Sequence, residues 1–296
     1  MPDRSDRTDQ SAPSEWSLSA PRTLTFEEPV TALNVRLVGG TVNVVGAGTG
    51  PARLELSEID GRPLVVSLHQ GTLTVGYEDL PWQHILTWFD RREWSRSATV
   101  TLTVPAATRV EVGVVTASAV VSGVSGRTDV RGVGGDTTLV GLTGAVRAET
   151  VTGRLEAQSL GGDLRFHSVS GDLTLVDGSG GTVKAESVSG DVVVDLSPTA
   201  QCPDLDITSV SGEVAVRLPH PVDAEVDAGT ASGKVSCAFE DLRISGQWGA
   251  RKITGRLGTG HGKLKVTTVS GSVALLRRPV DPGNGPADVP AQGKVL

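Results

Sequence analysis

The chain has 296 residues, enough for one large all-β domain or two smaller ones, and 37 of them are glycine, against a usual share of about 7%. Its net charge of −7 and the lack of a basic cluster argue against nucleic acid as a partner. No apolar run approaches the roughly 18 residues of a membrane-spanning helix, and the two cysteines lack metal-binding spacing.

The domain organisation follows from where strand-like alternation begins and ends. Residues 1–20 are polar and contain no apolar core of a secretory signal, so we expect a disordered tail and a cytoplasmic protein. One β-repeat domain is expected over 21–278, with N-terminal rungs in 21–104 and regular repeats in 105–278. The Pro- and Gly-containing segment 279–296 is expected to be a second disordered tail.

A tryptophan-rich insertion interrupts the N-terminal rungs over residues 77–98. Its stretch YEDLPWQHILTWFDRREW contains half of the aromatic residues of the chain. Helical spacing would align several of its apolar side chains in one stripe. Two roles stay open: a lid over an end of a repeat stack, which such stacks need, or a docking element for a protein partner. The candidate interaction residues are Trp82, Ile85, Trp88, Phe89 and Trp94.

The central block repeats with a period of nine residues. Its glycines include Gly126, Gly135, Gly144, Gly153, Gly162 and Gly171. Counted from each of these glycines, the second and fourth residues that follow are mostly apolar and the third is mostly polar. This is the period-two alternation of a strand. The glycine marks a corner where the backbone turns or approaches another chain segment closely. Each nine-residue unit is therefore predicted to be a short strand followed by a turn.

Two such units make one coil with strands on two opposed faces. The words HSVSGDLTL (167–175) and ESVSGDVVV (186–194) stand in corresponding coils. One coil cannot bury its apolar face alone, so stacking must supply the core. We therefore predict an all-β fold, a β-solenoid-like stack of strand-turn repeats with two long sheets. The residue before the SG corner, such as Val169, is expected to point into this core.

The two outer faces of the predicted stack differ. One column reads Glu111, Asp129, Arg147, Arg165 and Lys184, whose charges of opposite sign can pair across strands. The other face, which we call the Val/Thr face, carries Val120, Thr138, Glu156, Thr174 and Val193, with Ser122, Val140, Gln158 and Val176 beside them. Either another part of the chain covers this face, or it meets a protein partner or a second copy. Its candidate interaction residues are Val120, Val140, Val176 and Val193.

Four carboxylates follow a repeat glycine and are candidates for chemistry at the corners: Asp136, Asp163, Asp172 and Asp191. Calcium-binding β-rolls need a Gly-x-Asp in every repeat, which this chain lacks. Asp172 and Asp191 are expected about one strand spacing apart, as an acid/base pair would require, but aspartate after glycine is also a good turn residue. We expect no catalytic residue, metal or cofactor.

The repeated words carry a resemblance to a known family. SVSGD at 168–172 and TGRLEAQS at 152–159 are similar to the bacterial β-strand-repeat domains known as "putative adhesin" or toastrack domains, over most of 31–277. The resemblance implies a repeat fold and no catalytic residues. The family name implies adhesion, and some members look connected to cell-envelope stress signalling.

These observations favour a non-enzymatic scaffold that binds a protein or associates with itself. The alternative is a surface adhesin or carbohydrate-binding module, and a carbohydrate-active enzyme of the β-helix type ranks third.

Overall fold

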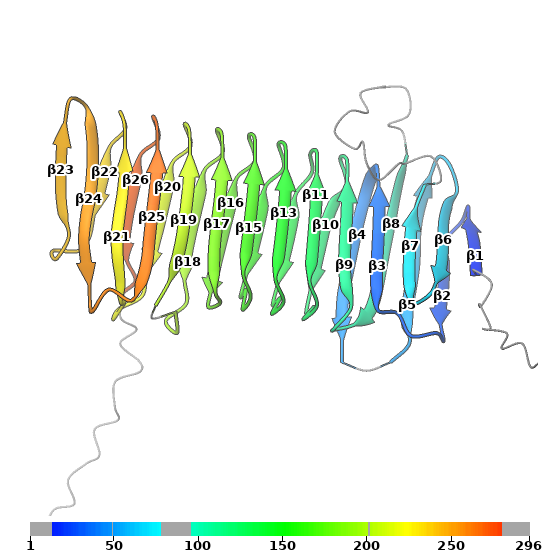
Figure 1. The fold of residues 1–296 in the computed structure, drawn as a ribbon. Helices are drawn as coiled ribbons and strands as arrows, with labels where there is room; N and C mark the ends of the chain where they lie inside the picture. Colours follow the sequence, from blue (N-terminus) through cyan, green and yellow to red (C-terminus); the bar gives the residue numbers. More distant parts are fainter. Residues whose placement is uncertain (1–13, 49, 78–95, 201, 280–296) are drawn as a thin grey trace, which may run out of the picture.

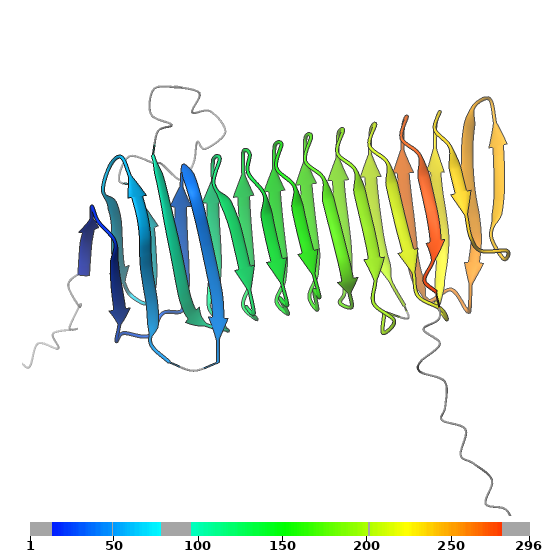
Figure 2. The same cartoon turned by 180° about the vertical axis from the view of Figure 1, so that it is seen from behind.

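The computed structural model describes residues 14–48, 50–77, 96–200 and 202–279. Their regular structure consists of strands in two long sheets that face each other across one core, as the sequence predicted (Figure 1; Figure 2 shows the view from behind). The described residues hold no helix of the length and apolarity that crossing a membrane would require.

In spatial order, the 14-stranded sheet contains β1 (Ser14–Leu18), β6 (Leu64–His69), β7 (Thr72–Gly76), β3 (Ala32–Leu37), β9 (Arg109–Val114), β11 (Thr128–Gly132), β13 (Val146–Thr150), β15 (Leu164–Ser168), β17 (Thr182–Ser187), β19 (Asp204–Ser209), β25 (Gly262–Thr268), β21 (Ala224–Thr230), β24 (Ala250–Leu257) and β23 (Arg243–Gln247). The 12-stranded sheet contains, again in spatial order, β2 (Arg22–Phe26), β5 (Ala52–Asp60), β8 (Ser97–Pro105), β4 (Gly39–Ala47), β10 (Ser118–Ser122), β12 (Thr137–Val140), β14 (Leu155–Gln158), β16 (Leu173–Gly178), β18 (Val192–Leu196), β20 (Val214–Leu218), β26 (Val273–Arg277) and β22 (Val235–Cys237).

The central coils have the predicted arrangement. From β9 to β20 successive strands alternate between the sheets, and each is parallel to its counterpart in the next coil. Val121, Leu139 and Ala157 are aligned in one buried column because the strands pair without a shift. Phe166 is fully buried between Ala148 and Ala185 on the neighbouring strands, so small and large side chains alternate along this column.

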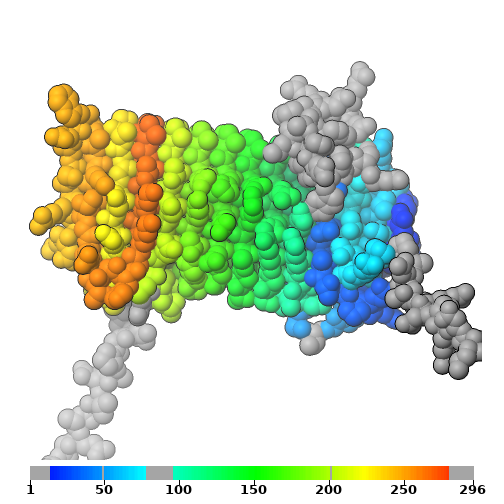
Figure 3. Space-filling view, in the orientation of Figure 1, coloured from blue at the N-terminus to red at the C-terminus, as the bar shows by residue number. Residues whose placement is uncertain are grey.

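The chain does not wind evenly at the two ends of the stack. At the N-terminal end β1, β2, β5 and β6 run antiparallel to neighbouring strands. At the other end the last coil, β25 and β26, lies between β19–β20 and the earlier strands β21–β22. Figure 3 shows this as an orange band between two yellow bands. β1 begins at Ser14, so the prediction of a disordered tail over 1–20 is wrong for its last residues. Trp16 on β1 packs edge to face against Phe26, with 5.4 Å between the ring centres.

The corner glycines let consecutive coils approach closely. A Cβ built on Gly190 would lie 2.0 Å from the carbonyl oxygen of Gly171, and one on Gly171 would lie 2.2 Å from that of Gly153. The first serine of each SVSG word secures the same corner. The Ser168 hydroxyl accepts a hydrogen bond from the Gly171 N–H at 2.6 Å, and Ser187 does the same for Gly190 at 3.0 Å. The words repeat because this corner repeats.

The two edges of the stack have different corners, which corrects the expectation for Val169. After β14, Ser159 has a φ of 54°, and this left-handed residue shifts the alternation so that Leu160 points into the core. After β15 the alternation continues without a shift, so Ser168 points inward and Val169 is 49% exposed. Val188, Val210 and Val269 are exposed in the same way, as a row along one edge of the stack.

Candidate interaction surface

The Val/Thr face is the outer surface of the 12-stranded sheet. Val120, Thr138, Glu156, Thr174 and Val193 are aligned in direct register from β10 to β18. Glu156 is the one charged member of this row.

The candidate residues of the Val/Thr face are open to solvent to different degrees. Val176 is 39% and Val193 is 41% exposed, so no other layer of the described chain covers them. Val120 and Val140 are half-buried by their neighbours on the sheet. Sequence reasoning missed Val45 and Leu276, which are exposed on the same sheet. The sequence could have identified them, because each stands five residues after a repeat glycine (Gly40 and Gly271), as Val140 and Val176 do.

The opposite face, on the 14-stranded sheet, carries charges that pair with one another. Arg131 contacts Glu111 at 3.0 Å and Glu149 at 3.5 Å. Asp129 is buried; burial alone would raise its pKa, but the hydrogen bond and charge of Arg127, with the charge of Arg109, lower it below the ordinary value. Ion pairs across strands are therefore present, but they form with residues outside the predicted column, and Arg147 pairs with Glu149 on its own strand. Within the described residues no ion pair joins two members of that column, Glu111, Asp129, Arg147, Arg165 and Lys184. This charged face has internal partners for its groups, whereas the Val/Thr face leaves apolar groups in water.

Of the predicted insertion 77–98, residues 78–95 lie outside the described residues, and with them Trp82, Ile85, Trp88, Phe89 and Trp94, whereas its last two residues belong to β8. Whether the insertion is a lid or a docking element therefore stays open. The residues that flank 78–95 are anchored. Tyr77 is buried, which raises the pKa of its hydroxyl, and the Arg96 guanidinium lies 5.5 Å from the centre of its ring.

The corner aspartates have a structural role. Asp172 Oδ1 accepts a hydrogen bond from the Asp191 N–H at 3.0 Å, and Asp191 Oδ1 accepts one from the Glu213 N–H at 2.8 Å. Asp163 binds the Thr182 N–H in the same way at 2.7 Å. Each carboxylate thus caps a backbone donor of the next coil, which accounts for aspartate at this position without acid/base chemistry.

Replacing Asp191 with alanine is expected to lower the free energy of unfolding by about 1 kcal/mol, because the Glu213 N–H loses its acceptor. Asparagine keeps an acceptor oxygen and should cost less. Arg154 occupies the corresponding slot after Gly153, so Arg154→Ala is the matched control and should have little effect. Urea unfolding of the three variants measures the differences. Equal losses for alanine and asparagine would show that the acceptor is not what matters.

A cluster of Asp223, Thr259 and His261 was not recognised from sequence, because its members lie on two separate segments. The Thr259 hydroxyl donates to Asp223 Oδ2, and His261 Nδ1 lies 2.8 Å from the same oxygen. The backbone N–H of His261 donates to Asp223 Oδ1 at 3.0 Å. In a hydrolase triad the hydroxyl contacts the ring nitrogen opposite the carboxylate, whereas here the hydroxyl lies 2.5 Å from Nδ1, on the carboxylate side. The cluster therefore clamps the 258–261 loop and has no geometry for activating a nucleophile.

The Asp223 clamp is expected to weaken in acid. Hydrogen bonds from Thr259, then His261, hold the pKa of the Asp223 carboxyl below its ordinary value. Since the folded pKa is below the unfolded one, the stabilisation is complete above a pH of about 4 and is lost as the pH falls further. The melting temperature of the wild type should then fall more between neutral and acidic pH than that of Asp223→Asn. Asp227→Asn is the control, and identical pH profiles for wild type and Asp223→Asn would contradict the clamp.

No group of three or more metal-ligating side chains occurs within the described ranges. Cys202 is exposed and Cys237 partly buried, and both are free thiols.

The family model Toastrack DUF4097 matches residues 56–276, three quarters of the chain, so the chain belongs to the toastrack family, a domain of unknown function. A search of the curated proteins found no match. One similar solved structure is the crystal structure of a "putative cell adhesion protein" from Clostridium sporogenes ATCC 15579, with 12% identity and a TM-score of 0.31 over 88% of this chain and 100% of that one.

Proposed function

We propose that this toastrack domain is a non-enzymatic scaffold that binds a protein partner through the Val/Thr face. The observation that carries the proposal is the row from Val120 to Val193, in which β-branched and hydroxyl side chains stand in register with one charge among them. Val176, Val193, Val45 and Leu276 are each about 40% exposed on this sheet.

The contrast between the two faces supports the choice. An extended apolar area on a soluble domain usually marks an interaction site, and such sites have fewer charges than the rest of the surface. On the charged face, groups such as Arg131 and Glu186 already pair within the chain. A partner that covered the charged face would have to compete with those pairs, whereas one that covered the Val/Thr face would bury mostly apolar and hydroxyl groups, with Glu156 and Gln158 as the exceptions.

The neighbouring hypotheses have less support. The carboxylates and the Asp223 cluster have structural partners, so they give no observation in favour of catalysis. The adhesin alternative, a place in cell-envelope stress signalling and a cytoplasmic location stay predictions from the sequence.

The test is photo-crosslinking in cells, with a photoreactive amino acid in place of Val193. The opposite-face control carries it in place of Arg165, whose strand β15 belongs to the charged sheet. We expect a discrete protein adduct from position 193 and none from 165. When Val176→Asp is added to the first variant, the adduct at 193 should disappear, because the substitution places a charge on the apolar face.

The outcomes separate the possibilities. An adduct of this chain with itself would identify the partner as a second copy, which the proposal includes. Adducts of equal yield from both positions, or an adduct at 193 that survives Val176→Asp, would reject the Val/Thr face as the specific site. The melting temperature of Val176→Asp should differ little from that of the wild type, because this position is exposed. This measurement shows whether a lost adduct results from unfolding of the variant.

A further inference from the structure

The C-terminal end of the stack has an uneven edge. The 14-stranded sheet extends beyond β22, the last strand of the opposite sheet, by the hairpin of β24 and β23. β23 has a single neighbour, and all five of its residues are exposed. In an antiparallel hairpin with a two-residue loop, alternate residues direct their backbone groups away from the partner strand. Ile244 and Gly246 therefore present N–H and C=O groups at an open edge.

The turn of this hairpin breaks a local rule. Trp248 and Gly249 connect the strands with φ values of 55° and 91°, the left-handed pattern that favours asparagine and glycine. A bulky residue in this conformation is uncommon. Trp248 is also 100% exposed, and Ile244 is 55% exposed. Trp248 therefore has an unfavourable backbone conformation and buries no surface that would stabilise the fold. Residues with such strained conformations are concentrated at functional sites.

The same end is basic although the chain is acidic. Residues 221–278 contain nine Lys/Arg and five Asp/Glu, whereas the whole chain has a net charge of −7. Arg243 on β23 and Arg251 on β24 form no ion pair with any of the residues that the structure describes. Ser245 and Gly246, which stand opposite Lys252 and Arg251, are small and leave room for these long side chains near the edge.

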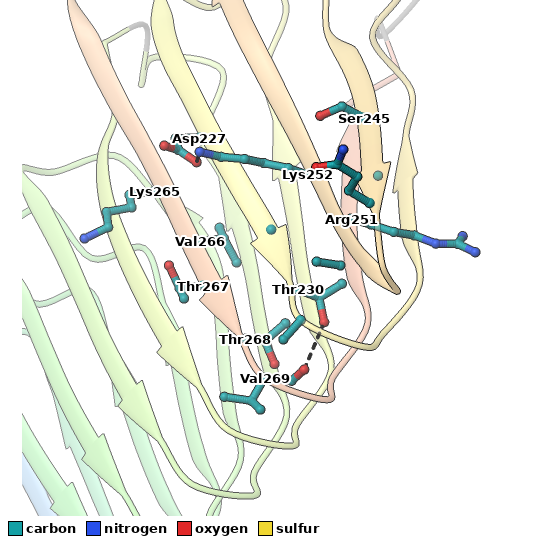
Figure 4. A pocket seen from close by; sticks show the side chains of 15 residues that line it. Asp227, Thr230, Ser245, Arg251, Lys252, Lys265, Val266, Thr267, Thr268 and Val269 are labelled. Atoms are coloured by element: carbon teal, nitrogen blue, oxygen red, sulfur yellow. Dashed lines mark hydrogen bonds and ion pairs between the residues drawn. The ribbon is translucent and has the colours of Figure 1, made fainter.

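A groove of about 730 Å³ connects this edge with the outer face of the sheet. Ser245, Gly246 and Gln247 line it from β23, and Lys252 and Lys265 line it from β24 and β25. In Figure 4, Lys252 extends toward Asp227, 2.9 Å away, and Arg251 extends in the opposite direction. The groove therefore has hydroxyl, amide and ammonium groups and one carboxylate that is already paired.

We propose that β23 accepts an extended acidic peptide segment of a partner protein as an added strand of the 14-stranded sheet. In this mode of recognition the backbone groups of the edge supply the affinity and the side chains supply the specificity. Acidic side chains on one face of the added strand meet Arg243 and Lys252, which share that face, and apolar ones on the other face meet Ile244 and Trp248. Arg251 lies on the face of Ile244 and adds to the positive charge of the edge. A second copy of this chain is a poorer occupant of the same edge, because two such ends would bring like charges together. This site is separate from the Val/Thr face and does not depend on it.

The probe for the test is a fluorescent peptide of about eight residues that alternates glutamate and valine. We expect saturable binding that weakens as salt is raised, with amide chemical-shift changes at Ile244 and Gly246 in the NMR spectrum. A peptide that alternates lysine and valine should not bind. Arg243→Glu should weaken binding, and Arg165→Glu in the middle of the same sheet is its matched charge control. The double variant Arg243→Glu with Arg251→Glu should weaken binding about tenfold.

Two further variants separate strand addition from simple attraction. Gly246→Pro removes an N–H that faces the open edge and should abolish the shifts at Ile244. Trp248→Asn should weaken binding about fivefold while leaving the melting temperature unchanged or raised, because asparagine suits the turn. If Gly246→Pro unfolds the hairpin, Trp248→Asn and the double arginine variant still decide the matter.

Three results would overturn the proposal. Polyglutamate that binds as tightly as the alternating peptide would show a non-specific basic patch. Equal weakening by Arg165→Glu and by Arg243→Glu would place the binding elsewhere. A dimer of the free protein, detected by light scattering and broken by Gly246→Pro, would assign the edge to a second copy.

Discussion

Alanine at position 190 is expected to destabilise the domain by about 3 kcal/mol, the upper end of what overpacking usually costs. The new Cβ would lie 2.0 Å from the carbonyl oxygen and 2.6 Å from the carbonyl carbon of Gly171. Both contacts are with backbone, so no side chain can move aside. The coils on either side of the corner must separate, and the hydrogen bond from the Gly190 N–H to Ser187 is disturbed with them.

The matched control for Gly190→Ala is Gly48→Ala. A Cβ on Gly48 would meet nothing within 4 Å, so this substitution should change stability by less than about 0.5 kcal/mol. Guanidinium unfolding followed by circular dichroism measures both variants. A Gly190→Ala protein as stable as the wild type would mean that the coils can spread at this corner, and close stacking of the backbone would not be required there.

The second large effect is expected at Phe166, where alanine should cost about 4 kcal/mol. Phe166 is fully buried, and its neighbours in the column are Ala148 and Ala185. Removal of the ring would leave three alanines in succession, and small side chains cannot fill the space by changing rotamer. The cost therefore includes both the lost burial and the cavity that remains.

Two companion variants test the cause of the Phe166→Ala loss. Phe166→Leu should cost roughly 1.5 kcal/mol, since most of the volume is kept. Adding Ala185→Leu to Phe166→Ala should restore part of the loss, because the new side chain refills the same column. A second substitution that makes the protein still less stable would argue against a cavity between these two residues.

The repeat shows how far sequence alone reaches. Alternation along a strand has a period of two, and two units of nine residues bring the chain back to the same sheet, one coil further along the stack. These two local facts were enough to assign Val121 and Leu139 to the core and Val176 and Val193 to an outer face. They were also enough to separate the charged face from the Val/Thr face, because a face is decided by parity along the strand.

The corners were predicted less well. Val169 and Leu160 occupy the same slot of the nine-residue frame, yet Leu160 is buried and Val169 is 49% exposed. The difference arises from one backbone dihedral, the positive φ of Ser159, which a frame of residue types does not contain. The hydrogen bonds of the corner aspartates were not predicted either. Their backbone acceptor role, as between Asp172 and Asp191, exists only when the next coil is in place.

The amino-acid sequence by itself determined the strand-turn unit, the stacking of units into two sheets, the chemistry of each outer face and the toastrack family. These properties depend on spacing within one or two repeats. The tertiary structure decided what depends on distant segments. It inserted β25 and β26 between earlier coils and brought Asp223 to His261. Among the described strands only β24 pairs with β23, which leaves its other edge open, and the opposite sheet ends at β22, which leaves the side chains of β23 exposed. A residue pattern cannot specify where either layer stops.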